Sequence, residues 1–82
     1  MPPHPRAGVR AQHLGENVRQ VRDKRGLSQR ALAAQMGAPW TQQIIAKLER
    51  AEVGMRVEQL LDLCDALGTT VARLLRGVRG VK

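Results

Sequence analysis

The chain has 82 residues, enough for one small domain. Hydrophobic residues make up 43% of it, yet Phe and Tyr are absent and Trp40 is its one aromatic residue, which favours packed helices of Leu, Val and Ala over a β-sandwich. Fourteen Lys and Arg against seven Asp and Glu give a net charge of +7 and a pI near 11.4, a balance typical of proteins that bind phosphate.

Several function classes are excluded by what the chain lacks. Cys64 is the single cysteine, so no internal disulfide can form and a reducing compartment is expected. No apolar run approaches the roughly 18 residues of a membrane span, and the first residues lack the apolar stretch of a secretory signal. We therefore expect a cytoplasmic protein that makes no membrane contact.

Charge is segregated along the sequence. Residues 1–48 carry eight basic and two acidic side chains, residues 49–72 carry two and five, and residues 73–82 carry four and none. The acidic stretch is thus separate from the first half, which the charge pattern marks as the binding half.

Residues 1–12 hold three of the four prolines and show no apolar periodicity, so we expect a flexible basic arm. This arm is either an inert terminus or a segment whose Arg6 and Arg10 reach phosphates or a minor groove. The folded domain is expected over residues 13–76. Its first helix is predicted from a repeat of apolar residues at Leu14, Val18 and Val21, and it ends at Gly26. The charged last turn, residues 22–25, is either a solvated helix end or a DNA contact.

The centre of the chain predicts two short helices joined by a turn. Ser28 is a good N-cap for a helix that buries Leu32 and Met36 and stops at Gly37. After the turn at residues 38–40, Thr41 caps a helix that runs to Glu49. That helix has two distinct faces. Its core face carries Ile45 and Leu48, and its opposite face carries Gln42, Gln43, Ala46 and Lys47. Paired amides at a helix start suit the donor and acceptor pair of adenine in the major groove.

The second half predicts two further helices, with a loop at residues 50–56 before them. A stripe of apolar residues predicts a helix that ends at Gly68, and Thr70 then caps a short one with Val71, Leu74 and Leu75 inward. The stripe consists of Val57, Leu60, Leu61, Cys64 and Leu67. A basic tail is expected over residues 77–82. The fold class is therefore all-α with five helices.

The inventory of reactive residues argues against an enzyme. Ser28 is better used as a cap, and Cys64 lies on the apolar face of a helix as a small hydrophobe. His4 and His13 have no cysteine or carboxylate cluster at ligand spacing. We expect no catalytic residues, no metal and no cofactor.

The order of elements and several residues resemble the helix-turn-helix domains of phage repressors, Cro proteins and xenobiotic-response-element-like bacterial regulators. The resemblance extends over about residues 14–75. It is carried by the segments Leu14-Gly15-Glu16, Arg25-Gly26-Leu27-Ser28-Gln29, Leu32-Ala33, Gly37, Leu48-Glu49-Arg50 and Leu60 to Gly68. It implies a compact, lambda-repressor-like domain whose second and third helices form the helix-turn-helix.

The resemblance also implies a binding surface for double-stranded DNA. Gln42, Gln43 and Lys47 occupy the base-reading positions, and Gln29 matches a residue that commonly holds a phosphate; Lys47 is open to guanine or to a phosphate. Arg30, Thr41 and Arg50 are expected along the DNA backbone. Arg22 and Glu49 are expected to form a partly buried ion pair that ties the first helix to the end of the third.

The turn at Ala38-Pro39-Trp40 is about two residues longer than is usual in the family, which leaves the tilt of the third helix open. Trp40 either folds over the core, the preferred reading, or lies near the DNA backbone. Ile44 stands where the family often has a small polar residue, and either touches a thymine methyl or packs under Trp40.

The function implied is a sequence-specific transcriptional regulator, and a repressor in particular, that associates with the nucleoid. A single reading helix contacts few base pairs, so we expect a homodimer on a palindromic operator, with the last helix and tail as its interface by analogy to the family. The alternative is a protein-interaction module, such as an antitoxin or a bridging factor that binds a protein partner.

Overall fold

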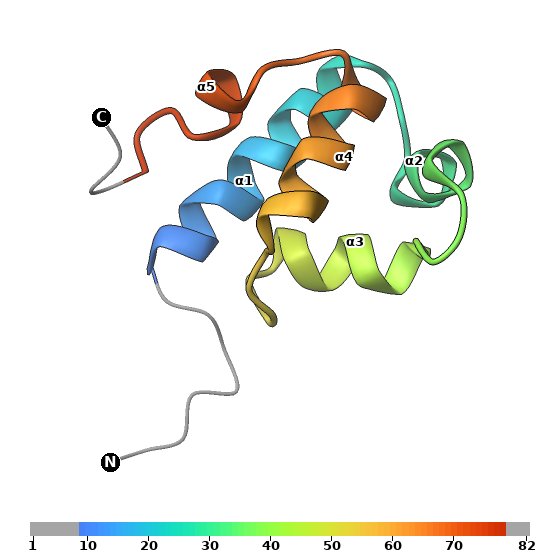
Figure 1. Cartoon of the computed structure of the whole chain (residues 1–82), viewed down its shortest axis with the longest axis horizontal. Helices are drawn as coiled ribbons and strands as arrows, with labels where there is room; N and C mark the ends of the chain where they lie inside the picture. The colour runs from blue at the N-terminus through green and yellow to red at the C-terminus, as the bar shows by residue number, and fades with distance from the viewer. Residues whose placement is uncertain (1–8, 79–82) are drawn as a thin grey trace.

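A computed structural model describes residues 9–78. Over this range the chain forms five helices and no strand, which confirms the predicted all-α class. The helices are α1 (Val9–Lys24), α2 (Gln29–Met36), α3 (Gln42–Glu49), α4 (Val57–Leu67) and α5 (Val71–Leu74). In Figure 1, α1 and α4 run through the middle of the molecule, with α2 and α3 on one side of them and α5 on the other. No helix of the described range is long and apolar enough to cross a membrane.

One hydrophobic core joins all five helices. Its fully buried side chains come from every element: Val18, Leu32, Ile45, Leu63, Leu67 and Leu74. The apolar stripe predicted for the first helix is confirmed, since Val18 and Val21 are buried and Leu14 packs against the core. Aliphatic side chains fill this core, and the indole of Trp40 packs at its edge.

Three helices begin at a hydroxyl cap, as predicted. The hydroxyl oxygen of Ser28 accepts from the backbone N–H of Ala31 at 2.9 Å, and that of Thr41 accepts from Ile44 at 3.2 Å. Thr70 does the same for the N–H of Arg73 at 3.1 Å. Each cap satisfies one backbone donor that has no partner inside its helix.

The C-terminal end of α4 is held by side chains from the turn after α1 and from α2. Arg25 Nε donates to the Leu67 carbonyl at 2.7 Å and its Nη2 donates to the Gly68 carbonyl at 2.9 Å. Gln35 Nε2 donates to the Ala66 carbonyl at 2.7 Å. The cation also opposes the negative end of the helix dipole. Within the charged turn at residues 22–25, Arg25 therefore makes a structural contact inside the domain.

The first helix starts earlier than expected. It begins at Val9, so residues 9–12 are helical rather than part of a flexible arm, and residues 1–8 lie outside the described range. Residues 9–13 contain no proline and no glycine. Extending an existing helix costs far less than starting one, so these residues continue the turns anchored on the core by Leu14 and Val18.

The predicted inward stripe of α4 is wrong at two positions. Val57 is 71% exposed and Leu61 is 48% exposed, whereas Leu63 is fully buried. The core lies against Leu60, Leu63, Cys64 and Leu67 instead. Because α4 carries apolar residues around much of its circumference, its sequence allows two stripes, and the positions of α1, α2 and α5 select one.

The fold continues past the expected boundary at residue 76. Asn17 is buried in α1, and its Nδ2 donates to the carbonyls of Leu74 at 2.7 Å and Arg76 at 2.8 Å. Val78, expected in a basic tail, is buried, and its N–H donates to the Leu75 carbonyl at 3.0 Å. The segment after α5 is therefore fastened to α1 at least as far as Val78; residues 79–82 lie outside the described range.

Candidate nucleic-acid interface

Helix α3 presents polar side chains on the side that faces away from the core. Ile45 and Leu48 are buried beneath it, while Gln42, Gln43 and Lys47 are exposed. Two amides and one ammonium group are therefore free to meet a ligand on one short helix. The amides can donate and accept together, and the ammonium group only donates.

The far end of α3 is fixed by the ion pair expected between Arg22 and Glu49. Arg22 Nε donates to Glu49 Oε2 at 2.7 Å, and Nη2 donates to Oε1 at 3.0 Å, so the pair is bidentate. Arg22 Nη1 also donates to the Leu27 carbonyl at 2.8 Å. Both side chains are buried, and among the described residues no buried side-chain nitrogen or oxygen is left without a partner. One guanidinium thus joins α1, the α1–α2 connection and α3.

The hydrogen bonds to Glu49 raise the pKa of Arg22 above its ordinary value, against the effect of burial. The guanidinium accordingly stays charged, as arginine does in proteins generally. A permanent cation buried beside Glu49 makes the carboxylate necessary at this position, because a buried charge without its partner is costly.

Gly15 lets α1 approach the end of α3 closely. A Cβ atom at this position would lie 2.6 Å from the carbonyl oxygens of both Leu48 and Glu49. Such distances are far inside van der Waals contact, so an alanine would force the two backbones apart. The segment Leu14-Gly15-Glu16 therefore has a packing function in this chain.

The side chains expected to contact a DNA backbone lie near the two ends of α3 and on α2. Thr41 stands at the start of α3, and its hydroxyl, which accepts from Ile44, keeps its own hydrogen free to donate. Gln29 lies at the other end of α3, where its Nε2 donates to Glu49 Oε1 at 3.1 Å. Arg50 ends α3 and is exposed, with its Nε 2.6 Å from Glu52 Oε2. Arg30 is exposed in the first turn of α2.

Trp40 packs over the core, which was the preferred of its two predicted placements. Its indole is partly buried, and its backbone N–H donates to the Gly37 carbonyl at 2.9 Å. Ile44 is also partly buried and lines a hollow together with Trp40. The residues between α2 and α3 thus form a closed turn with an apolar underside.

Two further side chains, Asn17 and Gln59, hold the helices around α3 in place, and neither is predicted from the sequence. Asn17 falls three residues after Leu14 and one before Val18, so a polar residue inside the apolar stripe of α1 was the available signal. Gln59 is the third residue of α4, and its Oε1 accepts from the N–H of the N-cap residue Arg56 at 2.9 Å. The pattern of a polar residue three positions after a helix start could have identified it.

Helices α2 and α3 are short and joined by a turn, and α3 exposes a polar face while α1, α4 and α5 form the scaffold behind the pair. This arrangement defines the helix-turn-helix class of domains. A family model described as "Helix-turn-helix domain" matches residues 13–80. The chain belongs to this family.

Solved structures show the same fold. The clp gene regulator ClgR from C. glutamicum is 29% identical, with 84% of this chain and 87% of that chain covered at a TM-score of 0.76. The restriction-modification controller protein C.AhdI from Aeromonas hydrophila is 26% identical over 78% of this chain and 94% of that one, with a TM-score of 0.72. The P22 c2 repressor, in a complex with a synthetic operator, is 34% identical over 78% and 94%, with a TM-score of 0.67. A comparison with curated proteins found no match.

Proposed function

We propose that this protein is a sequence-specific regulator of transcription that binds double-stranded DNA, and that it acts as a repressor. The observation that carries the proposal is the exposed polar face of α3 over a buried, ion-paired underside. The family supports it, as do the similar structures, which include gene regulators and a repressor bound to operator DNA. Such a protein would work on chromosomal DNA, in association with the nucleoid of its cell.

In this proposal α3 lies in the major groove and reads bases with the side chains of its outer face. Gln42 and Gln43 are suited to adenine, whose N6 and N7 offer one donor and one acceptor to an amide. Lys47 stands one turn after Gln43 and donates to guanine or to a phosphate. Glu49 is excluded from base contact because its carboxylate is buried against Arg22.

The DNA backbone contacts are assigned to Gln29, Arg30, Thr41 and Arg50. Gln29 uses one amide hydrogen on Glu49, which leaves the second hydrogen free for a phosphate oxygen. Arg50 would exchange its exposed pairing with Glu52 for a phosphate at little cost, since exposed ion pairs contribute less than about 1 kcal/mol. These contacts position α3 without selecting a sequence.

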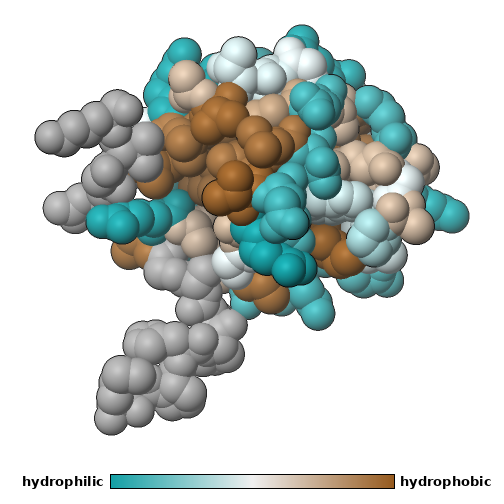
Figure 2. Space-filling model, viewed as in Figure 1, coloured by the Kyte–Doolittle hydropathy of each residue, from teal (hydrophilic) through white to brown (hydrophobic). Residues whose placement is uncertain are grey.

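A homodimer on a two-fold symmetric operator completes the proposal. One short helix reads only a few base pairs, so two domains are needed for adequate specificity. The resemblance to the family implies the last helix and tail as the interface, and the exposed apolar side chains of α4, which packs against α5, add to this surface for the partner copy. Figure 2 shows hydrophobic side chains gathered on the face of the molecule where α4 and α5 lie, and Val57 and Leu61 are the large exposed ones on α4.

Selecting bound sequences from a random pool of duplex DNA tests the proposal. The expected result is an enriched motif with two-fold symmetry, whose half-sites contain the adenines that two glutamines would read. A gel shift at low salt against DNA upstream of the protein's own gene is the companion measurement. A well-folded protein that enriches no motif and shifts no DNA would contradict the proposal and favour a protein-interaction module.

A further inference from the structure

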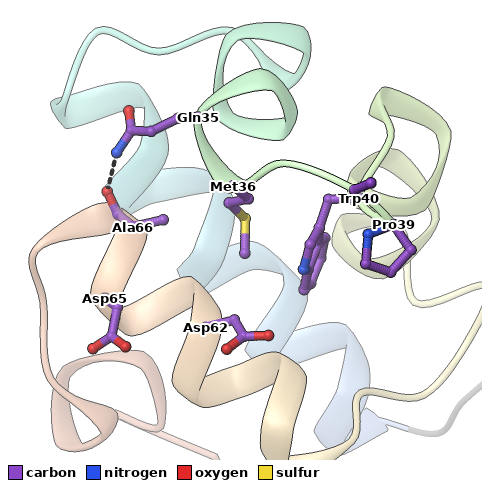
Figure 3. A pocket seen from close by; sticks show the side chains of 8 residues that line it. Gln35, Met36, Pro39, Trp40, Asp62, Asp65 and Ala66 are labelled. Atoms are coloured by element: carbon purple, nitrogen blue, oxygen red, sulfur yellow. Dashed lines mark hydrogen bonds between the residues drawn. The ribbon is translucent and has the colours of Figure 1, made fainter.

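A hollow of about 380 Å³ opens between the α2–α3 turn and the exposed side of α4 (Figure 3). Apolar and acidic groups line it together. The lining residues are Gln35, Met36, Ala38, Pro39, Trp40, Asp62, Asp65 and Ala66. This volume lies within the range of about 300 to 1,000 Å³ typical of small-molecule sites. The proposed DNA contacts use none of these side chains.

The acidic groups belong to a row along α4. Glu58, Asp62 and Asp65 follow one another at helical spacings of four and three, and α4 contains no Lys or Arg. Within residues 9–78 none of the three forms an ion pair, although Arg56 lines a smaller neighbouring hollow beside Glu58 and Asp62. Like charges at these spacings destabilise a helix, and a bound cation would relieve that repulsion.

An indole stands opposite this row. Figure 3 shows Met36 and Trp40 projecting from the α2–α3 segment toward α4, with the Asp62 carboxylate between them and the helix. Pro39, Trp40 and Asp62 line both hollows, so they form the wall common to the two. The face of an indole and a carboxylate each attract a cation, whereas both disfavour a phosphate.

We propose that this hollow binds an organic cation, a guanidinium or alkylammonium group carried on an apolar stem. The charged group would stack on Trp40 and pair with Asp62, with Asp65 adding negative charge one turn further along α4. The stem would lie on Met36 and Ala66. A guanidinium fits best, because it stacks on aromatic rings and binds carboxylates in a fixed geometry.

The same chemistry can come from a free small molecule or from an arginine side chain of another protein. In either case the bound group touches the residue that precedes Thr41, the cap of α3. Binding to the hollow requires no DNA, so the failure of this inference and the failure of DNA binding are separate results.

Trp40 makes a direct test possible, because it is the only Trp, Tyr or Phe in the chain and its fluorescence reports binding at the wall that the two hollows share. The full-length protein is titrated with butylguanidinium and with butylurea, its uncharged isostere. A parallel pair, an end-capped Gly-Arg-Gly peptide and its citrulline counterpart, represents a protein side chain. Calorimetry of the same four compounds detects binding that leaves the fluorescence unchanged.

We expect saturable binding of the guanidinium compounds and weaker binding of the uncharged ones. Asp62→Asn should weaken the binding of the guanidinium compounds about fivefold, as for an exposed close charge pair. Trp40→Leu, whose binding is measured by calorimetry, should weaken it by roughly three- to tenfold. Glu16→Gln removes the same charge from the exposed side of α1 and should change nothing. The tighter of the two guanidinium compounds identifies the source. The proposal would be overturned if charged and uncharged compounds bound equally, or if the folded Asp62→Asn variant bound the guanidinium compounds as tightly as the wild type. It would also be overturned if neither method detected binding.

Discussion

Glu49 accepts hydrogen bonds from Arg22 and Gln29, side chains of two other helices. Its carboxylate is therefore the point at which α1, α2 and α3 are joined beneath the exposed polar face of α3. A buried ion pair adds little net stability over an apolar pair of the same size, but losing one partner leaves a buried charge uncompensated.

Glu49→Gln should accordingly destabilise the domain by about 3 to 5 kcal/mol, measured by urea unfolding and by the melting temperature. Glu52→Gln is the matched control, because it removes the same charge from the exposed pair with Arg50 and should cost less than about 1 kcal/mol. An unchanged melting temperature for Glu49→Gln would show that this buried pair does not hold the helices together.

Gln42 and Gln43 belong to the proposed base-reading face of α3 and Arg30 to the proposed contacts with the DNA backbone, so substitutions at the two places should have different effects on DNA binding. Gln42→Ala or Gln43→Ala should cost about 1 to 3 kcal/mol on the selected operator and much less on random DNA. Arg30→Ala should weaken binding to the operator and to random DNA nearly equally. It should also reduce the slope of log K for DNA binding against log salt by about 1. Titrations at several salt concentrations separate the two. Equal losses on both DNAs would remove the glutamines from base reading.

Among the elements, α1 and α3 cross unusually closely at Gly15. Gly15→Ala should destabilise the domain by about 1 to 3 kcal/mol, because the clash with two carbonyl oxygens outweighs the better helix propensity of alanine. Gly54→Ala, where nothing lies within 4 Å of the added atom, is the control and should be neutral or slightly stabilising. Chemical denaturation measures both. If the two substitutions had equal effects, close packing at Gly15 would not matter.

The sequence predicts correctly those features that depend only on residues close together along the chain. Ser28, Thr41 and Thr70 cap helices because a hydroxyl reaches a backbone N–H three residues on, and the division of α3 into apolar and polar faces needs only its own eight residues. The exposed side chains of the candidate site, Gln42, Gln43 and Lys47, could be located in this way; their contacts with bases stay predictions.

Other features depend on contacts between distant segments, and no local pattern specifies them. The face of α4 that turns inward is selected by its neighbours, which is why Leu63 rather than Leu61 is buried. The sequence allows Arg25 either a place in a solvated helix end or a DNA contact, whereas in the fold its guanidinium donates to carbonyls 42 and 43 residues away. Similarly, Asn17 fixes the chain after α5, so Val78 joins the fold.

At the scale of the whole molecule, the helix-turn-helix and α4 expose side chains of opposite charge. Arg30 and Lys47 are exposed on α2 and α3, whereas α4 exposes three carboxylates and no basic side chain. Val57 and Leu61 extend from α4 as large exposed apolar groups. A protein of this size gains stability by covering such apolar groups, and a two-fold dimer covers those of both copies in one interface.

Leu61→Glu should therefore weaken the dimer without unfolding the monomer. We expect the dimer dissociation constant to rise at least about tenfold, because both copies lose a leucine worth about 1.5 to 3 kcal/mol when buried. Sedimentation at micromolar concentration measures the constant with and without operator DNA, which also shows whether the dimer forms only on DNA. Val9→Glu changes an exposed apolar residue on α1 and should leave the constant unaltered. If Leu61→Glu behaved like the wild type in both conditions, the partner copy would have to bind elsewhere, because an isologous interface cannot accept two new carboxylates at its centre without cost.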